Sequence, residues 1–110
     1  MLTLPIKKKW YDMIISGEKK EEYRELTQYY KSRFKNLFDM YPYSFIPTGQ
    51  DVKKIIFRNG YSNKSPSCVA EVSLDIGTGK LEWGAEPGKD YYILKIHALR
   101  IREPTEEEQK

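Results

Sequence analysis

The sequence predicts a single α+β domain in which two N-terminal helices pack against a curved or closed β-sheet. Apolar residues recur twice at helical spacing in the first part of the chain, and three segments with the composition of strands follow. The length of 110 residues suits one domain. Aromatic residues make up 14% of the chain, which argues against disorder because disordered chains contain few of them.

The first expected elements are a short strand and a helix that ends at a glycine. Residues 2–6 alternate apolar side chains, and Pro5 suits an edge strand because an edge tolerates the missing N–H. Residues 7–16 then change to helical spacing, and Gly17 follows where a C-terminal helix glycine is expected. The apolar face of this helix comprises Trp10, Met13 and Ile14.

The next segment, residues 18–26, is almost wholly charged. Its Glu and Lys residues favour helix, but the preceding glycine indicates that the first helix has ended, so we expect a strand. In an extended chain Lys20, Glu22 and Arg24 would share one face. Lys19 would lie on the other face. A charged strand indicates a polar cleft, and the alternatives are a solvated strand or a continuation of the helix.

A second helix is expected over about residues 28–40, with Thr27 as its N-cap. Residues 42–51 contain two prolines and a glycine and indicate a loop. The amphipathic stripe of the helix comprises Tyr30, Phe34, Leu37, Phe38 and Tyr41.

The second half of the chain predicts three strands, over residues 52–58, 69–76 and 91–102, joined by loops at 61–68 and 77–90. The side chains expected to face inward from the last two strands are Ala70, Val72, Leu74, Ile76, Tyr92, Leu94, Ile96 and Ala98. The residues expected to form the core are Trp10, Ile14, Phe34, Ile56, Val72, Leu74, Leu94 and Ile96.

Charge divides the chain into a basic domain and an acidic tail. Residues 103–110 hold four Glu and one Lys, a net charge of −3. The whole chain carries +3, so residues 1–102 have a net charge of +6. We therefore expect a domain over 1–102 and a frayed tail over 103–110. The basic bias is compatible with a phosphate-bearing partner, and lysines scattered for solubility are the alternative.

Composition also argues against several classes of protein. No apolar run has the length of a membrane span or a signal peptide. Cys68 and His97 are each the single residue of their type, so an internal disulfide and a Cys-based zinc cluster are excluded. We expect a cytoplasmic protein that uses no metal and no cofactor.

Residues 17–24, Gly-Glu-Lys-Lys-Glu-Glu-Tyr-Arg, fit the pattern G-x-K-x-x-E-x-R. In this the chain resembles the ASCH family, over Leu2 to about Ile101. The blocks 57–61 and 82–89 are similar to those of small bacterial and prophage ASCH proteins. The resemblance implies a small PUA-like β-barrel of about five to six strands, with two helices packed at its side and end.

The resemblance also implies a polar cleft that binds RNA or a modified nucleotide, with Lys19, Glu22 and Arg24 as ligand-binding residues. The alternative is a small hydrolase acting on RNA or on an acylated cytidine, with Lys19 as acid or base beside Glu22. Lys19 matches the lysine of both catalytic branches of the family. Glu22 stands where the acetylcytidine amidohydrolases have threonine, so binding and hydrolysis both remain open.

Two other groups of residues are candidates for ligand contacts. Arg58, Asn59 and Tyr61 end a strand beside a glycine and could clamp a phosphate and stack on a base. A simple Asn-Gly turn is the alternative. Trp83 lies in a glycine-rich loop, where it could form a stacking platform or a lid on the end of the barrel.

Overall fold

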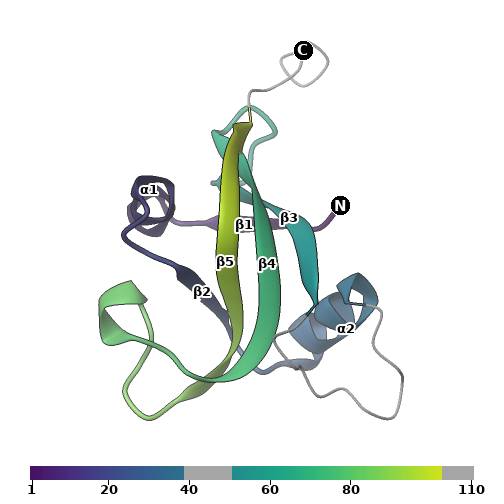
Figure 1. The fold of residues 1–110 in the computed structure, drawn as a ribbon, viewed down its shortest axis with the longest axis vertical. Helices are drawn as coiled ribbons and strands as arrows, with labels where there is room; N and C mark the ends of the chain where they lie inside the picture. The colour runs from purple at the N-terminus through teal and green to yellow at the C-terminus, as the bar shows by residue number, and fades with distance from the viewer. Residues whose placement is uncertain (39–50, 103–110) are drawn as a thin grey trace.

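A computed structural model describes residues 1–38 and 51–102 of the chain. Five strands form one mixed sheet in the order β1-β3-β4-β5-β2, shown in Figure 1. The expected loop before residue 51 and the acidic tail lie outside the described residues, and the second helix ends at Leu37, earlier than expected. The elements are β1 (Thr3–Ile6), α1 (Lys8–Ser16), β2 (Glu21–Arg24), α2 (Gln28–Leu37), β3 (Val52–Asn59), β4 (Ser67–Thr78), the 3-10 helix η1 (Leu81–Trp83) and β5 (Asp90–Arg102).

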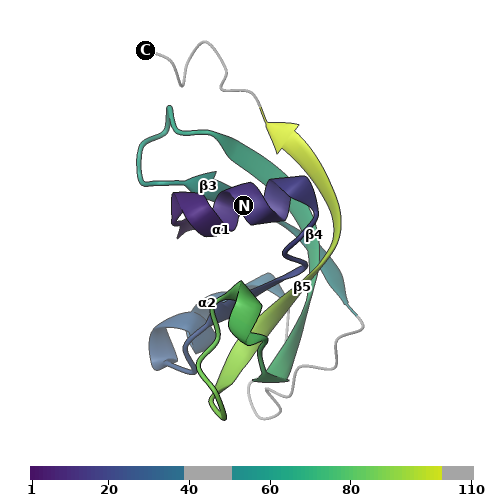
Figure 2. The ribbon, with the colours of Figure 1, turned by 90° about the vertical axis from the view of Figure 1, so that its left-hand side faces the viewer.

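The sheet curves into a half-barrel whose concave side holds both helices (Figure 2). Strand β1 pairs with β3 in parallel, and the other neighbours are antiparallel. The predicted α+β class with two helices is confirmed, and so is the position of β1 at an edge. The other edge is β2, so the charged segment borders the open side of the half-barrel.

Local signals explain where the first helix ends and the second begins. Gly17 adopts φ 85°, a left-handed conformation that favours glycine, and its N–H donates to the Ile14 carbonyl. The chain is then extended over Glu21–Arg24, as predicted, although the strand is shorter than expected. Thr27 caps α2 because its hydroxyl accepts a hydrogen bond from the Tyr30 N–H at 3.3 Å.

The core lies between the concave face of the sheet and the two helices. Five of the eight predicted core residues lie in this core: Ile14, Phe34, Val72, Leu74 and Leu94. Ile56 is buried but lies on the convex face, in register with Val69, so its predicted inward placement was wrong. The inward positions of β3 belong to its neighbours Ile55 and Phe57, because successive strand residues alternate between faces. The other two, Trp10 and Ile96, are only half-buried and pack against the edge of this core.

A β-bulge in β5 corrects the predicted inward face of that strand. Glu71 pairs with Ala98 and Val72 pairs with Ile96, so His97 is the extra residue. Because one inserted residue reverses the alternation, Ala98 lies on the convex face with Glu71, and the inward prediction for Ala98 was wrong. Ile76 keeps the register of the core face but is 41% exposed near the end of β4.

Candidate functional site

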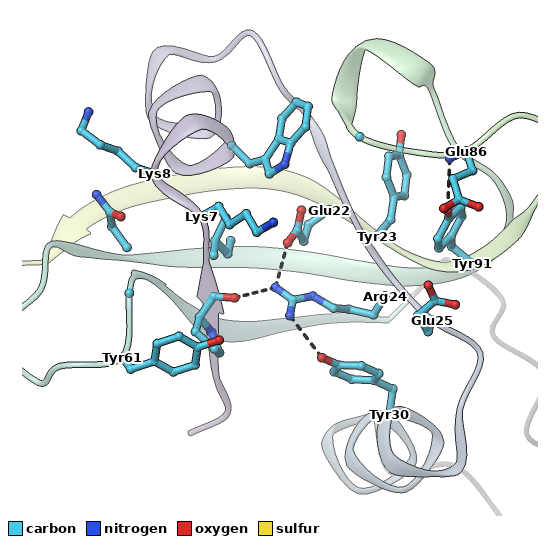
Figure 3. Close-up of a pocket in the computed structure, with 16 residues that line it drawn as sticks. Lys7, Lys8, Glu22, Tyr23, Arg24, Glu25, Tyr30, Tyr61, Glu86 and Tyr91 are labelled. Carbon is cyan, nitrogen blue, oxygen red and sulfur yellow. Dashed lines mark hydrogen bonds and ion pairs between the residues drawn. The ribbon is translucent and has the colours of Figure 1, made fainter.

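A cavity of about 600 Å³ opens between the two edge strands, where the half-barrel is not closed by backbone pairing. Strand β1 contributes Pro5 and Ile6, and β2 contributes Glu22, Tyr23 and Arg24. Helix α2 contributes Tyr30, and the loop before β5 contributes Gly84 and Glu86. Figure 3 shows the Arg24 side chain at the centre, between Glu22 and Tyr30.

The Arg24 guanidinium bridges the gap between the two edge strands. Its Nη2 lies 2.8 Å from Glu22 Oε2 and donates to the Pro5 carbonyl at 3.0 Å. Its Nη1 donates to the Tyr30 hydroxyl at 3.3 Å. The Nε atom is buried without a hydrogen-bond partner. Three of the five guanidinium N–H groups have partners and Nε is enclosed, so one N–H on Nη1 is left for a ligand.

Lys19 lies behind Glu22 and completes a buried cation–anion–cation network. Its Nζ lies 3.0 Å from Glu22 Oε1, and its side chain is 1% exposed. The ammonium also donates to the Trp83 carbonyl at 2.7 Å. Rings of Trp10 and Tyr23 lie over it at 5.3 and 4.9 Å. One carboxylate therefore faces two cations in a poorly solvated place.

The predicted placement of Lys19 on the face opposite Glu22 was wrong. Strand β2 begins at Glu21, so the alternation of a strand does not extend back to Lys19. Its backbone N–H instead donates to the Met13 carbonyl of α1. This contact turns the lysine side chain toward the same side of the sheet as Glu22.

Burial lowers the pKa of Lys19 below its usual value, and the charge of Glu22 opposes that change. A lysine with a lowered pKa can exchange a proton nearer neutral pH than a solvated one. Lys19 does not line the cavity, however, and its ammonium is held by Glu22 and Trp83. In this structure its ammonium holds the position of Glu22, which does line the cavity.

The loop over residues 79–90 is fastened to β2 and β5. The Tyr23 hydroxyl accepts from the Lys80 N–H at 2.9 Å, and the Tyr91 hydroxyl accepts from the Glu86 N–H at 3.0 Å. A Cβ at Gly79 would lie 2.7 Å from Ala85 and Tyr23 side-chain atoms, so only glycine fits there. These contacts hold the wall of the cavity that faces the charged network.

The other predicted ligand-binding residues are divided between two faces. Asn59 and Tyr61 line the cavity, and Tyr61 is 90% exposed at its rim. Arg58 pairs in register with Ser67, which places it on the convex face. Trp83 offers its carbonyl to Lys19, and its ring lies 4.4 Å from the Lys80 ammonium rather than lining the cavity.

Sequence reasoning missed the role of Tyr30, which it placed only in the apolar stripe of α2. In the structure its hydroxyl reaches Arg24, and its ring stacks on Phe34 at 5.8 Å between centroids. The available signal was the residue type, because a half-buried Tyr needs a hydrogen-bond partner that Phe does not.

Comparisons with protein-family models, curated proteins and solved structures find no match. Within residues 1–38 and 51–102 there is no group of three acidic, His or Cys side chains placed to hold a metal ion. No helix in the same ranges combines the length and apolar character needed to cross a membrane.

Proposed function

We propose that this protein is an ASCH-like domain that binds RNA or a nucleotide, modified or not, in the cavity between β1 and β2. The observation that carries the proposal is the convergence of Glu22 and Arg24 on one cavity with donor capacity left on the guanidinium. Carboxylate and guanidinium groups together offer acceptors and donors to the polar edge of a base or to a phosphate.

The size and the walls of the cavity support a ligand with a planar ring. About 600 Å³ lies in the range typical of small-molecule sites. Unpaired bases stack on aromatic side chains and on arginine, and this supplies affinity with little dependence on sequence. The aromatic residues that line the cavity are Trp10, Tyr23, Tyr30, Tyr61 and Tyr91.

The charges around the cavity support an anionic ligand. Lys7 and Lys8 lie at the rim, where Lys8 also pairs with Asp12, and Lys19 adds a cation beneath the floor. Two of the acidic groups are partly neutralised, since Glu22 faces two cations and Glu25 pairs with Lys89 at 2.8 Å. This distribution of charge favours a phosphate near Lys7 and Lys8 and a base near Glu22 and Arg24.

Replacing the guanidinium of Arg24 with an ammonium tests this proposal. We expect Arg24→Lys to weaken binding of nucleoside monophosphates at least about tenfold, because a lysine keeps the charge but loses the two-point contact. Titration calorimetry at low salt measures the change. Arg33→Lys is the matched control, since Arg33 stacks on Tyr29 at 3.3 Å outside the cavity lining. Equal affinities for wild type and Arg24→Lys would contradict the proposal.

Hydrolysis of RNA or of an acylated cytidine is the second candidate function, favoured by the lowered pKa of Lys19 beside Glu22. If Lys19 acts as a general base, turnover should rise with pH through its pKa, because only the neutral amine accepts a proton. Lys19→Ala and Lys19→Arg should then both abolish turnover. The binding proposal expects the wild type to turn over neither substrate in a product assay, since Lys19 does not line the cavity.

A further inference from the structure

The convex face of the sheet lies on the side away from both helices (Figure 2). The pairing register places several arginines on this face. Across three neighbouring strands, Arg58 is in register with Ser67, and Ser67 is in register with Arg102. In the next row, Val69 lies between Ile56 and Arg100. Residues in register on adjacent strands share a face, so the three arginines project from one side.

The bulge at His97 creates this arrangement. Without the inserted residue, the even-numbered positions at the end of β5 would continue the core face of Leu94 and Ile96. The bulge shifts Arg100 and Arg102 to the convex face, in register with Val69 and Ser67. The end of β5 therefore presents its charges on the same face as Arg58.

Arg58 and Arg100 carry charges that no neighbouring carboxylate within residues 1–38 and 51–102 neutralises. Among residues 1–38 and 51–102 neither arginine has an ion pair, and the Nε of Arg58 is buried without a hydrogen-bond partner. Arg100 is exposed. Ser67, which lies between Arg58 and Arg102 in register, is buried although it faces outward. On this face the nearest carboxylate to Arg100 along β4 is that of Glu71, two residues beyond Val69, and it is in register with Lys54.

We propose that this convex basic face, with Arg58 and Arg100 as its contacts, binds the phosphate backbone of an RNA whose base occupies the cavity. The inference rests on the proposed function. Arginine forks match phosphate oxygens, and clustered like charges raise the local concentration of a polyanion. Strands β3 and β5, which carry Arg58 and Arg100, lie two strand spacings apart, at about 10 Å, a span that suits two contacts along one RNA backbone.

The cavity and the convex basic face are close together along β3. Asn59 lines the cavity and Arg58 precedes it on the opposite face, at the end of β3. Tyr61, at the rim between them, is 90% exposed and free to stack on a base. An RNA held in the cavity can therefore pass over residues 59–61 to reach the arginines.

The salt dependence of binding tests this face. The probes are a mixed-sequence single-stranded RNA of about ten nucleotides and the four nucleoside monophosphates. We expect Arg58→Gln with Arg100→Gln to lower the slope of log K against log salt by about 1.4 for the RNA, since each lost phosphate contact removes about 0.7. The monophosphate affinities should stay unchanged. Lys31→Gln with Lys35→Gln removes the same charge from α2 and should leave the slope nearly unchanged.

Three results would overturn the proposal: an unchanged slope in the arginine variant, an equal fall in the lysine control, or competition by polyglutamate as effective as that by RNA. Failure of the cavity proposal has a separate signature. The wild type would then bind no monophosphate, while the slope for the longer RNA would still respond to the two arginines.

Discussion

Glu22→Gln is expected to lower the free energy of unfolding by about 3–5 kcal/mol, because it leaves two buried cations without their counter-charge. The Lys19 ammonium is 3.0 Å from one carboxylate oxygen, and the Arg24 guanidinium is 2.8 Å from the other. Glutamine has nearly the same shape, so the loss reports charge rather than packing. Urea denaturation followed by circular dichroism measures it.

Two comparisons isolate the charge effect. Glu21→Gln changes the neighbouring carboxylate, which accepts a hydrogen bond from the half-buried Tyr23 hydroxyl at 2.7 Å. This substitution should lower the free energy of unfolding by less than about 1 kcal/mol. Adding Lys19→Met to Glu22→Gln should restore part of the loss, because it removes one uncompensated buried cation. A loss at Glu22 no larger than at Glu21 would show that solvent screens the network.

Leu94→Ala is the core substitution with the largest expected effect, about 2–5 kcal/mol in the free energy of unfolding. Leu94 is fully buried at the centre of β5, in register with Leu74 of β4 and with Glu22 of β2. Truncation opens a cavity beneath the charged network. The loss is measured by the same denaturation.

Ile96→Ala provides the comparison, since Ile96 is only half-buried two residues along the same strand. Ile96→Ala should lower the free energy of unfolding by clearly less than Leu94→Ala, because its side chain buries less apolar area in the folded state. Losses below about 0.5 kcal/mol at both positions would mean that β5 is not central to the core.

Most of the fold could be predicted because its signals are local. Gly17 and Thr27 mark the ends of their helices through backbone conformation and capping, and both effects depend on the residues next to them. The alternation in β4 likewise follows from its own sequence. The bulge at His97 could not be predicted this way, because a bulge is defined by pairing with another strand. That is why the face of Ala98 was predicted wrongly.

The site could be predicted only in part, for a related reason. The spacing of Glu22 and Arg24 put both on one face of an extended segment, and the structure places them there. The position of Lys19 depends on the Trp83 carbonyl, and that of Arg24 on the Pro5 carbonyl and the Tyr30 hydroxyl. These partners are distant in sequence or on another element, so no local pattern indicates them.

The central claim is that the cavity between β1 and β2 binds a nucleotide. Its most direct test is a titration of ¹⁵N-labelled protein with each nucleoside monophosphate at low salt, followed by amide chemical shifts. We predict saturable shifts concentrated at Glu22, Tyr23, Arg24, Asn59 and Gly60, which line the cavity, with little change on α2 beyond Tyr30. No shift with any of the four nucleotides, or shifts confined to surfaces away from these residues, would contradict the claim.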